Sequence, residues 1–353
     1  MRLGAYQLIY LDRIPPRAAC SESVELCKLY SNRGAAGFVN AVLREISRRL
    51  DRLPLPDKDQ EPYKYLSVLY SCPEWLCYMW DTMYGREKAQ GILEAMNIHP
   101  YLTLRANSLR ITRDELYREL QNEGIPCTPT RLSPHGVKLG EFVPIAELRW
   151  LSDGLCFVQD EASQLCVDEL APQPGELVID TCACPGGKSF GCAIAMGNKG
   201  KVIAMDLHEN KLSLVRRGAQ NLGIDIIETI AHNGLSPHPG FFGAADKVIC
   251  DAPCSGLGVI AKKPDLRFKK PEDLARLPEL QLRLLSSAAE YVKPGGTLMY
   301  STCTLSKAEN EGVAQRFLET VRGFELDGIG MRTLFPHENG TDGFFMAKFK
   351  RVR

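Results

Sequence analysis

Residues 176–189 read ELVIDTCACPGGKS, and this stretch decides the fold of the chain. The apolar run that ends at Asp180 predicts a buried strand, and the Gly186–Gly187 pair predicts a tight turn into a helix. Glycines at such a turn let the backbone approach a ligand closely. The next predicted strand ends at Asp206, 20 residues after Gly186. An acid at that offset suits the two hydroxyl groups of a ribose, so the stretch predicts a nucleoside site.

The turn differs from a dinucleotide-binding turn, because the pattern G-x-G-x-x-G is absent and Pro185 precedes the glycine pair. A turn that has no pyrophosphate to cradle can be shorter. The pattern therefore favours an adenosine-type ligand without phosphates, such as S-adenosylmethionine (SAM). The alternative is an ordinary tight turn between a strand and a helix.

Short apolar runs of this kind recur through the second half of the chain, and helical stretches separate them. This alternation predicts a parallel sheet that is covered by helices on both faces. We expect an α/β fold, with a Rossmann-like, doubly wound and mostly parallel domain over residues 154–353. The predicted strands are Leu177–Asp180, Val202–Asp206, Ile226–Ala231, Lys247–Asp251 and Thr297–Thr302.

The first half of the chain has a different texture. Residues 1–50 predict helices, most clearly over 35–46, where apolar residues recur at helical spacing. Residues 51–64 carry three prolines and predict a linker. Residues 56–153 predict linker helices and a small α+β segment of RRM-like type, with strands in YLTLRAN (101–107) and GVKL (136–139).

The composition is that of an ordinary globular protein. Of the 353 residues, 44% are hydrophobic and 24% are charged, and the formal net charge is zero. A nucleic-acid site must therefore be a local patch. No apolar run approaches the ~18 residues of a membrane span, and the N-terminus has no signal-peptide pattern, so we expect a cytoplasmic protein without membrane contact. The 13 cysteines form no C-x2-C pair, and most are expected to pack as small apolar residues, without a metal.

Two cysteines stand apart, because each follows a predicted strand. Cys254 lies in DAPC (251–254), and Cys303 lies in STCT (301–304). The carboxyl ends of parallel strands meet at the edge that holds the ligand crevice. Both thiols and Asp251 should therefore converge near the cofactor. The alternative is two buried cysteines at strand ends, and the spacing alone does not decide between the two.

Five stretches together resemble the RNA cytosine-C5 methyltransferases, most closely the RsmB (Fmu) type that acts on 16S ribosomal RNA. They are VIDTCACPGGKS (178–189), DAPCSGLGV (251–259), KKPDLRF (262–268), GGTLMYSTCTL (295–305) and GTDGFFMAKF (340–349). VQDEASQ (158–164) fits the same pattern. RLGAYQ and the residues after it resemble the second half of a NusB-like helical domain, so residues 1–55 are expected to be a shortened, partial RNA-binding domain.

The resemblance implies roles for four residues in covalent catalysis. C5 of cytosine is a weak nucleophile, and a thiolate that adds at C6 turns the ring into an enamine that can accept a methyl group at C5. Cys303 is the implied nucleophile, and Cys254 assists release of the product. Asp251 is expected to hold the N3/N4 edge of the base, and Lys188 to position Asp251 or the base. DNA cytosine methylases use the cysteine of their PC motif as nucleophile, so the reverse assignment is the natural alternative.

The resemblance also implies contacts to SAM. The methionine end is expected to lie against Cys182, Ala183, Cys184, Pro185, Gly186, Gly187 and Lys188, with Asp251 nearby. Asp206 should bind the ribose and Asn233 the adenine. Relatives commonly carry Asp where this chain has Asn233, and an amide oxygen can still accept from the adenine amino group. Cys184 stands where alanine is usual and is expected to pack.

A basic segment follows the DAPC loop. It contains five cations and one aromatic residue, and it could contact phosphates beside the target base. The alternative is a solvated loop. The target cytosine must leave any helix to enter the site. The cations are Lys262, Lys263, Arg267, Lys269 and Lys270.

The predicted partner is 16S ribosomal RNA, free or in an early small-subunit particle, and the chain is expected to be a monomer. For the RsmB type the implied target is cytosine 967. Two rival functions stay open. One is the same reaction on a transfer RNA or on 23S ribosomal RNA, and the other is an RNA-binding protein of NusB type that has lost catalysis.

Overall fold

The computed structural model describes residues 1–140, 143–145 and 148–353. The chain divides into two compact units, Met1–Leu69 and Tyr70–Arg353. Among the described residues, no helix has the length and apolar character needed to cross a membrane.

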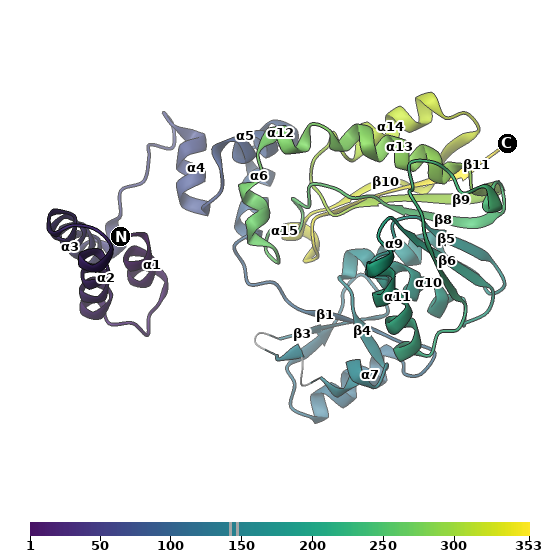
Figure 1. The fold of residues 1–353 in the computed structure, drawn as a ribbon, viewed down its shortest axis with the longest axis horizontal. Coiled ribbons are helices and arrows are strands. Elements are labelled where there is room, and N and C mark those ends of the chain that lie inside the picture. Colours follow the sequence, from purple (N-terminus) through teal and green to yellow (C-terminus); the bar gives the residue numbers. More distant parts are fainter. Residues whose placement is uncertain (141–142, 146–147) are drawn as a thin grey trace. The chain divides into compact units, whose positions relative to one another are not determined.

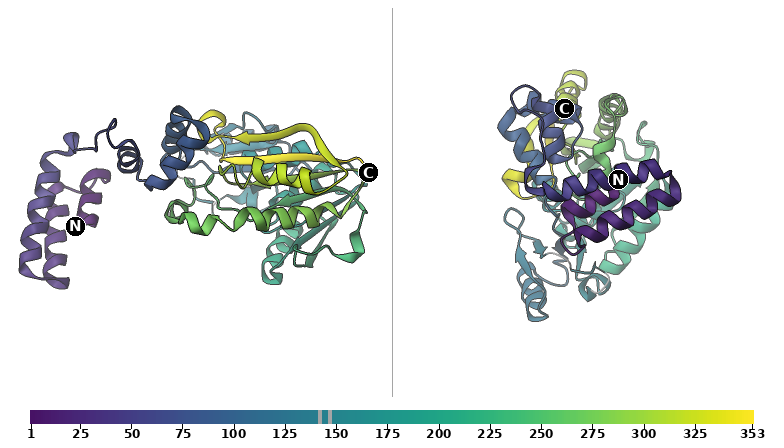
Figure 2. Two further views of the ribbon diagram at one scale, coloured as in Figure 1. Left: turned by 90° about the horizontal axis from the view of Figure 1, so that it is seen from above. Right: turned by 90° about the vertical axis from the view of Figure 1, so that its left-hand side faces the viewer.

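The first unit is built from three helices that pack around a small apolar core. α3 begins at Asn32, whose side chain accepts a hydrogen bond from the Ala35 N–H at 2.8 Å. Figure 2 shows α2 and α3 side by side, and the helix predicted over 35–46 lies within α3. The core residues are Leu8, Ala19, Cys20, Val39 and Leu43. The helices are α1 (Arg2–Tyr10), α2 (Pro16–Tyr30) and α3 (Arg33–Arg48); η1 (Leu50–Arg52) and α4 (Pro62–Tyr70) follow.

The second unit begins with two helices and a small antiparallel sheet of order β2-β3-β1-β4. α7 opens with a capping box between Thr112 and Glu115, which the sequence TRDE predicts. α7 covers the sheet through Leu116 and Leu120, which are fully buried. The elements are α5 (Glu74–Tyr84), α6 (Arg86–Ala95), β1 (Thr103–Ala106), α7 (Arg113–Asn122), β2 (Cys127–Pro129), β3 (Gly136–Leu139), α8 (Arg149–Ser152) and β4 (Cys156–Val158).

The rest of this unit is a seven-stranded sheet of order β10-β11-β9-β8-β5-β6-β7. The five strands that the sequence predicts are all present and parallel, so the predicted fold class is confirmed. Two further strands, which were not predicted as strands from the sequence, add an antiparallel edge. The strands are β5 (Leu177–Asp180), β6 (Lys201–Asp206), β7 (Ile227–Ala231), β8 (Ala245–Asp251), β9 (Val292–Thr302), β10 (Phe324–Leu334) and β11 (Phe344–Arg351).

Helices cover both faces of the sheet (Figure 1). One face carries α9 (Glu161–Leu170), α10 (Gly187–Ala195) and α11 (Glu209–Leu222), and the other carries α13 (Leu277–Ala289) and α14 (Glu311–Thr320). Short helical turns complete the unit: η3 (Pro239–Phe241), η4 (Pro264–Phe268), α12 (Pro271–Leu274) and α15 (Pro336–Asn339).

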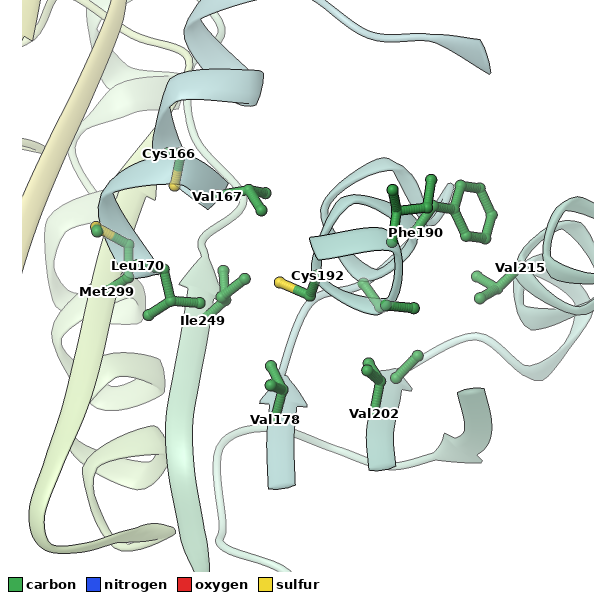
Figure 3. Packing of buried hydrophobic residues seen from close by; sticks show 14 of the residues in the cluster. Cys166, Val167, Leu170, Val178, Phe190, Cys192, Val202, Val215, Ile249 and Met299 are labelled. Atoms are coloured by element: carbon green, nitrogen blue, oxygen red, sulfur yellow. The ribbon is translucent and has the colours of Figure 1, made fainter. Parts of the chain in front are cut away.

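Two of the cysteines expected to pack lie in the core between the sheet and the first set of helices. Figure 3 shows Cys166 of α9 and Cys192 of α10 among Val178, Ile249 and other apolar side chains of the strands. Both thiols are fully buried, and burial raises their pKa, so they stay neutral. They therefore behave as small apolar residues.

The order of the strands changes direction at β5, because the chain continues to β6 on one side of β5 and later to β8 on the other side. The connection from β5 to β6 runs through α10 on one face, whereas the connection from β8 to β9 runs through α13 on the other. In such sheets the loops diverge at the carboxyl ends of the strands and leave a crevice for a ligand.

Candidate functional site

The turn after β5 requires glycine at its centre. Gly186 has φ +115°, a backbone conformation that residues other than glycine rarely adopt. A Cβ atom added at this position would lie 2.5 Å from the Phe190 ring. α10 begins immediately after it, and Ser189 on its first turn donates to Asp180 at 2.7 Å. Asp180 is buried, and burial raises its pKa to about 6. The turn and the strand end are thus fixed to each other.

Asp206 lies at the end of β6, next to this turn. One carboxylate oxygen accepts from the Cys184 N–H at 3.3 Å, and the other accepts from the His208 N–H at 3.0 Å. Each oxygen retains acceptor capacity, and the side chain is only partly buried. This carboxylate fits the two hydroxyl groups of a ribose, as the sequence predicts.

The loop after β7 is held beside Asp206. The sheet register pairs Asp206 with Ala231, and the His232 N–H donates to the Asp206 carbonyl at 2.9 Å. Asn233 follows and is exposed, with its side-chain oxygen accepting from the Leu235 N–H at 3.1 Å. Three loops that the sequence assigned to the cofactor therefore meet at one edge of the sheet.

Cys184 lies between the turn and Asp206. Burial and the neighbouring carboxylate of Asp206 raise the pKa of its thiol to about 12. The thiol is therefore neutral and a poor nucleophile at neutral pH. Among the described residues, no group of three or more His, Cys, Asp or Glu side chains could hold a metal ion.

The two cysteines at the strand ends are in direct contact. The register of β8 with β9 pairs Asp251 with Ser301, so Cys254 and Cys303 leave the sheet side by side. Their sulfur atoms are 3.3 Å apart, and both residues are partly buried. Both thiols can therefore reach the same small ring in the crevice.

The contact between the thiols makes them chemically unequal. A hydrogen bond from Cys254 lowers the pKa of the Cys303 thiol, against burial and the negative charge of Asp251. The same hydrogen bond, together with burial, raises the pKa of Cys254. Cys303 is therefore the better thiolate and Cys254 the better proton donor.

Lys188 and Asp251 form an ion pair beside the thiols. The Lys188 ammonium lies 2.6 Å from one carboxylate oxygen, and the Ser301 hydroxyl donates to the other at 2.7 Å. Burial alone would lower the pKa of Lys188, but the charge of Asp251 outweighs it and raises the pKa. Lys188 thus stays protonated and fixes the orientation of the carboxylate.

The loops that carry the cysteines are tied together by a buried polar network. The Ser255 hydroxyl lies 2.6 Å from the Thr304 hydroxyl, and the Ser255 N–H donates to Glu309 at 2.9 Å. Gln281 donates both to Glu309 at 2.9 Å and to the Pro253 carbonyl at 3.0 Å. Glu309 and Gln281 were not predicted to belong to the site, because nothing in their local sequence distinguishes them from other polar residues.

Lys262 of the basic segment already has two counter-ions within the protein, which the sequence did not reveal. It lies 2.7 Å from carboxylate oxygens of both Asp160 and Asp342. Burial and the charge of Asp160 raise the pKa of Asp342 to about 7, although Lys262 opposes the shift. The triad joins the start of α9, the basic segment and the GTDGFF stretch.

Two further cations of the segment serve as anchors. Arg267 donates to the Ser71 carbonyl at 2.8 Å, and Lys269 donates to the Ser255 carbonyl at 2.7 Å. Lys263 and Lys270 are exposed. Of the five cations predicted to contact phosphates, Lys262, Arg267 and Lys269 bind protein groups. Lys263 and Lys270 are therefore the better candidates for phosphate contacts.

Three family models match separate parts of the chain. The profile described as 16S rRNA methyltransferase RsmB/F matches residues 167–350. A ferredoxin-like domain of RsmF/B-like methyltransferases matches residues 72–146, and the NusB family matches residues 1–48.

Curated relatives match nearly the whole length of the chain. The chain is 40% identical over 368 residues to the probable ribosomal RNA small subunit methyltransferase B of Bacillus subtilis (strain 168), an alignment that covers 99% of this chain and 82% of that protein. It is 33% identical to the ribosomal RNA small subunit methyltransferase B of Cronobacter sakazakii, with 98% and 80% covered.

Solved structures share the fold. The crystal structure of PH0851 superposes with a TM-score of 0.82 at 27% identity, covering 99% of this chain and 80% of that one. NSun6 from Pyrococcus horikoshii, solved with SFG, has a TM-score of 0.72 at 22% identity, with 81% and 100% covered, and it supports the fold alone.

Proposed function

The chain belongs to the RsmB/F family of 16S ribosomal-RNA methyltransferases, and on that premise we propose that it methylates C5 of one cytosine in 16S ribosomal RNA. It is a SAM-dependent methyltransferase. The observation that carries the C5 assignment is the 3.3 Å contact between the sulfurs of Cys254 and Cys303. Methylation of a ring nitrogen or of a hydroxyl needs no thiol, whereas methylation of an unactivated ring carbon needs a nucleophile to add first.

The proposed reaction begins with Cys303. Its thiolate adds to C6 of the cytosine, a C6–S bond forms, and the electron pair of the C5–C6 double bond makes C5 nucleophilic. C5 then takes the methyl group, which SAM supplies. Solvent water takes the C5 proton next, the electron pair of the C5–H bond re-forms the C5–C6 double bond, and the C6–S bond breaks to return the thiolate. Cys254, held 3.3 Å from Cys303, assists this release.

Asp251 and Lys188 are proposed to hold the base. A carboxylate can accept from the exocyclic amine at the N4 edge, and an acid that shares a proton with N3 stabilises charge when C6 is attacked. The Lys188 and Ser301 contacts fix both carboxylate oxygens of Asp251 before the base arrives. Such preorganisation lowers the cost of binding the reacting ring in one orientation.

The proposed SAM site uses the loops that meet at the carboxyl edge of β5 and β6. Residues 182–188, with Asp251 nearby, would surround the methionine end. Asp206 would bind the ribose and Asn233 the adenine. The partly exposed Asp206 carboxylate and the glycine turn support this assignment.

We propose three functional parts for the chain: residues 1–55 as a partial NusB-like RNA-binding domain, 56–153 as linker helices with the small α+β segment, and 154–353 as the catalytic domain. The NusB match over residues 1–48 supports the first part. The relatives' names, ribosomal RNA small subunit methyltransferase B, support the small-subunit ribosomal RNA as the substrate. Within it we propose cytosine 967 as the site, and the cytoplasm, where ribosomes are assembled, as the location.

The test is methylation of RNA from cells that lack the enzyme. Purified protein and SAM are incubated with total RNA, and 5-methylcytosine is mapped by bisulfite sequencing. A single new site in 16S ribosomal RNA is expected. A site in a transfer RNA or in 23S ribosomal RNA would favour the first rival. Binding of RNA without any new 5-methylcytosine would favour a protein that has lost catalysis.

A further inference from the structure

Phe268 is an exposed aromatic residue that the proposed mechanism does not use. It is the last residue of η4 and is 75% exposed, in a part of the chain that lies between the catalytic loop and α12. Its neighbours in sequence, Arg267 and Lys269, are partly buried. The backbone thus turns these two cations partly inward and the aromatic ring between them outward, the reverse of the usual preference of a surface segment.

Three contacts hold this arrangement. The side chain of Leu266 packs against Gly256 of the DAPCSG loop, where an added Cβ would lie 2.9 Å from the Leu266 side chain. Arg267 donates to the Ser71 carbonyl at 2.8 Å on one side. On the other side, Lys269 donates to the carbonyl of Ser255, the residue after Cys254, at 2.7 Å.

This anchoring has an energetic consequence. Burial of a phenylalanine side chain is worth roughly 1.5–3 kcal/mol, which the protein forgoes while the ring stays in solvent. Because the residues before and after Phe268 are pinned, the segment cannot turn the ring inward without breaking these contacts. The ring is therefore presented in a fixed position beside the loop of Cys254.

The surroundings of the ring indicate what it contacts. Lys263 and Lys270, on either side of it in sequence, are exposed and can meet phosphates. A flat apolar ring beside free cations matches a nucleobase with its flanking phosphates. A base that leaves its stack to enter an active site also leaves its neighbour without a stacking partner, which costs a few kcal/mol.

We propose that Phe268 stacks on a base of the RNA strand next to the target cytosine and replaces the stacking lost when that cytosine turns into the site. The inference rests on the proposed function, because it places an RNA strand across the loop of Cys254. Phe268 is then a substrate contact that aligns the strand, while the cysteines and Asp251 act on the target ring.

The test compares Phe268→Ala, Phe268→Leu and Phe268→Trp in the full-length protein. The probe is a fluorescein-labelled 16S fragment that contains the unmodified target cytosine, and affinity is measured by anisotropy. Loss of one base–aromatic stack is worth about 1–3 kcal/mol, so Phe268→Ala should weaken binding about fivefold to 150-fold. Phe268→Leu keeps an apolar side chain without a ring and should lose most of that affinity, whereas Phe268→Trp should retain it.

A matched control is available in Phe242. This phenylalanine is 53% exposed and precedes β8, so it lies at the opposite edge of the sheet from the cysteines. Phe242→Ala should bind the RNA fragment as the unsubstituted protein does. SAM affinity by calorimetry and thermal unfolding should stay unchanged in all four variants, because both rings are mostly exposed.

A second measurement detects the stack directly. 2-Aminopurine is placed on either side of the target cytosine, and its fluorescence is quenched when it stacks on an aromatic ring. Binding of the unsubstituted protein should quench one of the two positions, and Phe268→Ala should not. Equal affinity and equal quenching in Phe268→Ala, with methylation of the fragment intact, would overturn the stacking role and leave the proposed function standing. Failure of the unsubstituted protein to bind or methylate the fragment would remove the proposed function and, with it, this inference.

Discussion

Replacing Cys254 with alanine should slow formation of the covalent RNA adduct and then trap it. The sulfur atoms of Cys254 and Cys303 share a hydrogen bond across 3.3 Å, and this bond lowers the pKa of the Cys303 thiol. A hydrogen bond to a charged group is worth roughly 1.5–3 kcal/mol, and a thiol forms weak hydrogen bonds, so its loss should cost the thiolate about 1.5 kcal/mol. The pKa of Cys303 should therefore rise when Cys254 is replaced.

A loss of about 1.4 kcal/mol is a factor of ten in an equilibrium constant, so the thiolate population of Cys303 should fall about tenfold. Alkylation of Cys303 by iodoacetamide near neutral pH should therefore be about tenfold slower in Cys254→Ala than in the unsubstituted protein. With SAM and substrate RNA, the variant should form the C6 adduct more slowly but fail to resolve it. A shifted protein band on a denaturing gel should accumulate over time, and faster at higher pH.

Cys303→Ala is the matched variant, because it removes the other sulfur of the same contact. It has no thiolate to add at C6, so neither adduct nor product should form. A shifted band for Cys303→Ala and none for Cys254→Ala would reverse the two roles. Full activity of both variants would show that neither thiol attacks the base, and the covalent mechanism would fail.

Four further outcomes are expected. Asp206→Ala should weaken SAM binding in calorimetry by about tenfold or more, because the ribose loses a charged acceptor; unchanged affinity would remove this strand from the cofactor site. Asn233→Asp should bind SAM as tightly as the unsubstituted protein or more tightly, since a carboxylate is a stronger acceptor for the adenine amine; complete loss of binding would show that residue 233 does not contact adenine. The double variant Lys263→Gln, Lys270→Gln should reduce the slope of log K for RNA binding against log salt concentration by about 1.4, at roughly 0.7 per phosphate contact on single strands. An unchanged slope would show that neither lysine contacts a phosphate. The pKa of Asp342 rises on folding from 3.8 to about 7, so the folded state binds that proton more tightly than the unfolded chain, and stability should fall as pH rises from about 4 to about 7; Asp342→Asn should remove this fall in urea midpoints measured at pH 5 and pH 8, and an unchanged pH dependence would show that Asp342 titrates normally.

The parallel part of the fold could be predicted from the sequence because its strands are buried on both faces. Val178 and Ile179 in β5, like Val248 and Ile249 in β8, are fully buried, and such strands appear as short unbroken apolar runs. β10 could not be predicted in this way, since all but its last residue are partly or fully exposed and its pattern lacks such a run. β2 and β4 have three residues each, too few to show any period.

The meeting of the two cysteines was predictable for a similar reason. Residues that follow parallel strands must lie at the same edge of the sheet, so local sequence was enough to bring Cys254 and Cys303 together. The partners of Lys262 were not predictable, because Asp160 and Asp342 lie 102 and 80 residues away in sequence. A charge run shows how many cations a segment has, and only the tertiary structure shows which of them already have a counter-ion.

The position of Cys254 depends on residues outside its own motif. The backbone on either side of it is held by hydrogen bonds from Gln281 to Pro253 and from Ser255 to Glu309. Glu309 and Gln281 are themselves buried and bonded to each other, and a buried acceptor that loses its donors costs about 1–3 kcal/mol. The network therefore resists any shift of the DAPCSG loop, and Lys269 extends this restraint to η4 through the Ser255 carbonyl. The thiol that assists release and the ring of Phe268 are consequently fixed by one set of contacts, so an RNA strand aligned on Phe268 would enter a site whose sulfur atoms are already in place.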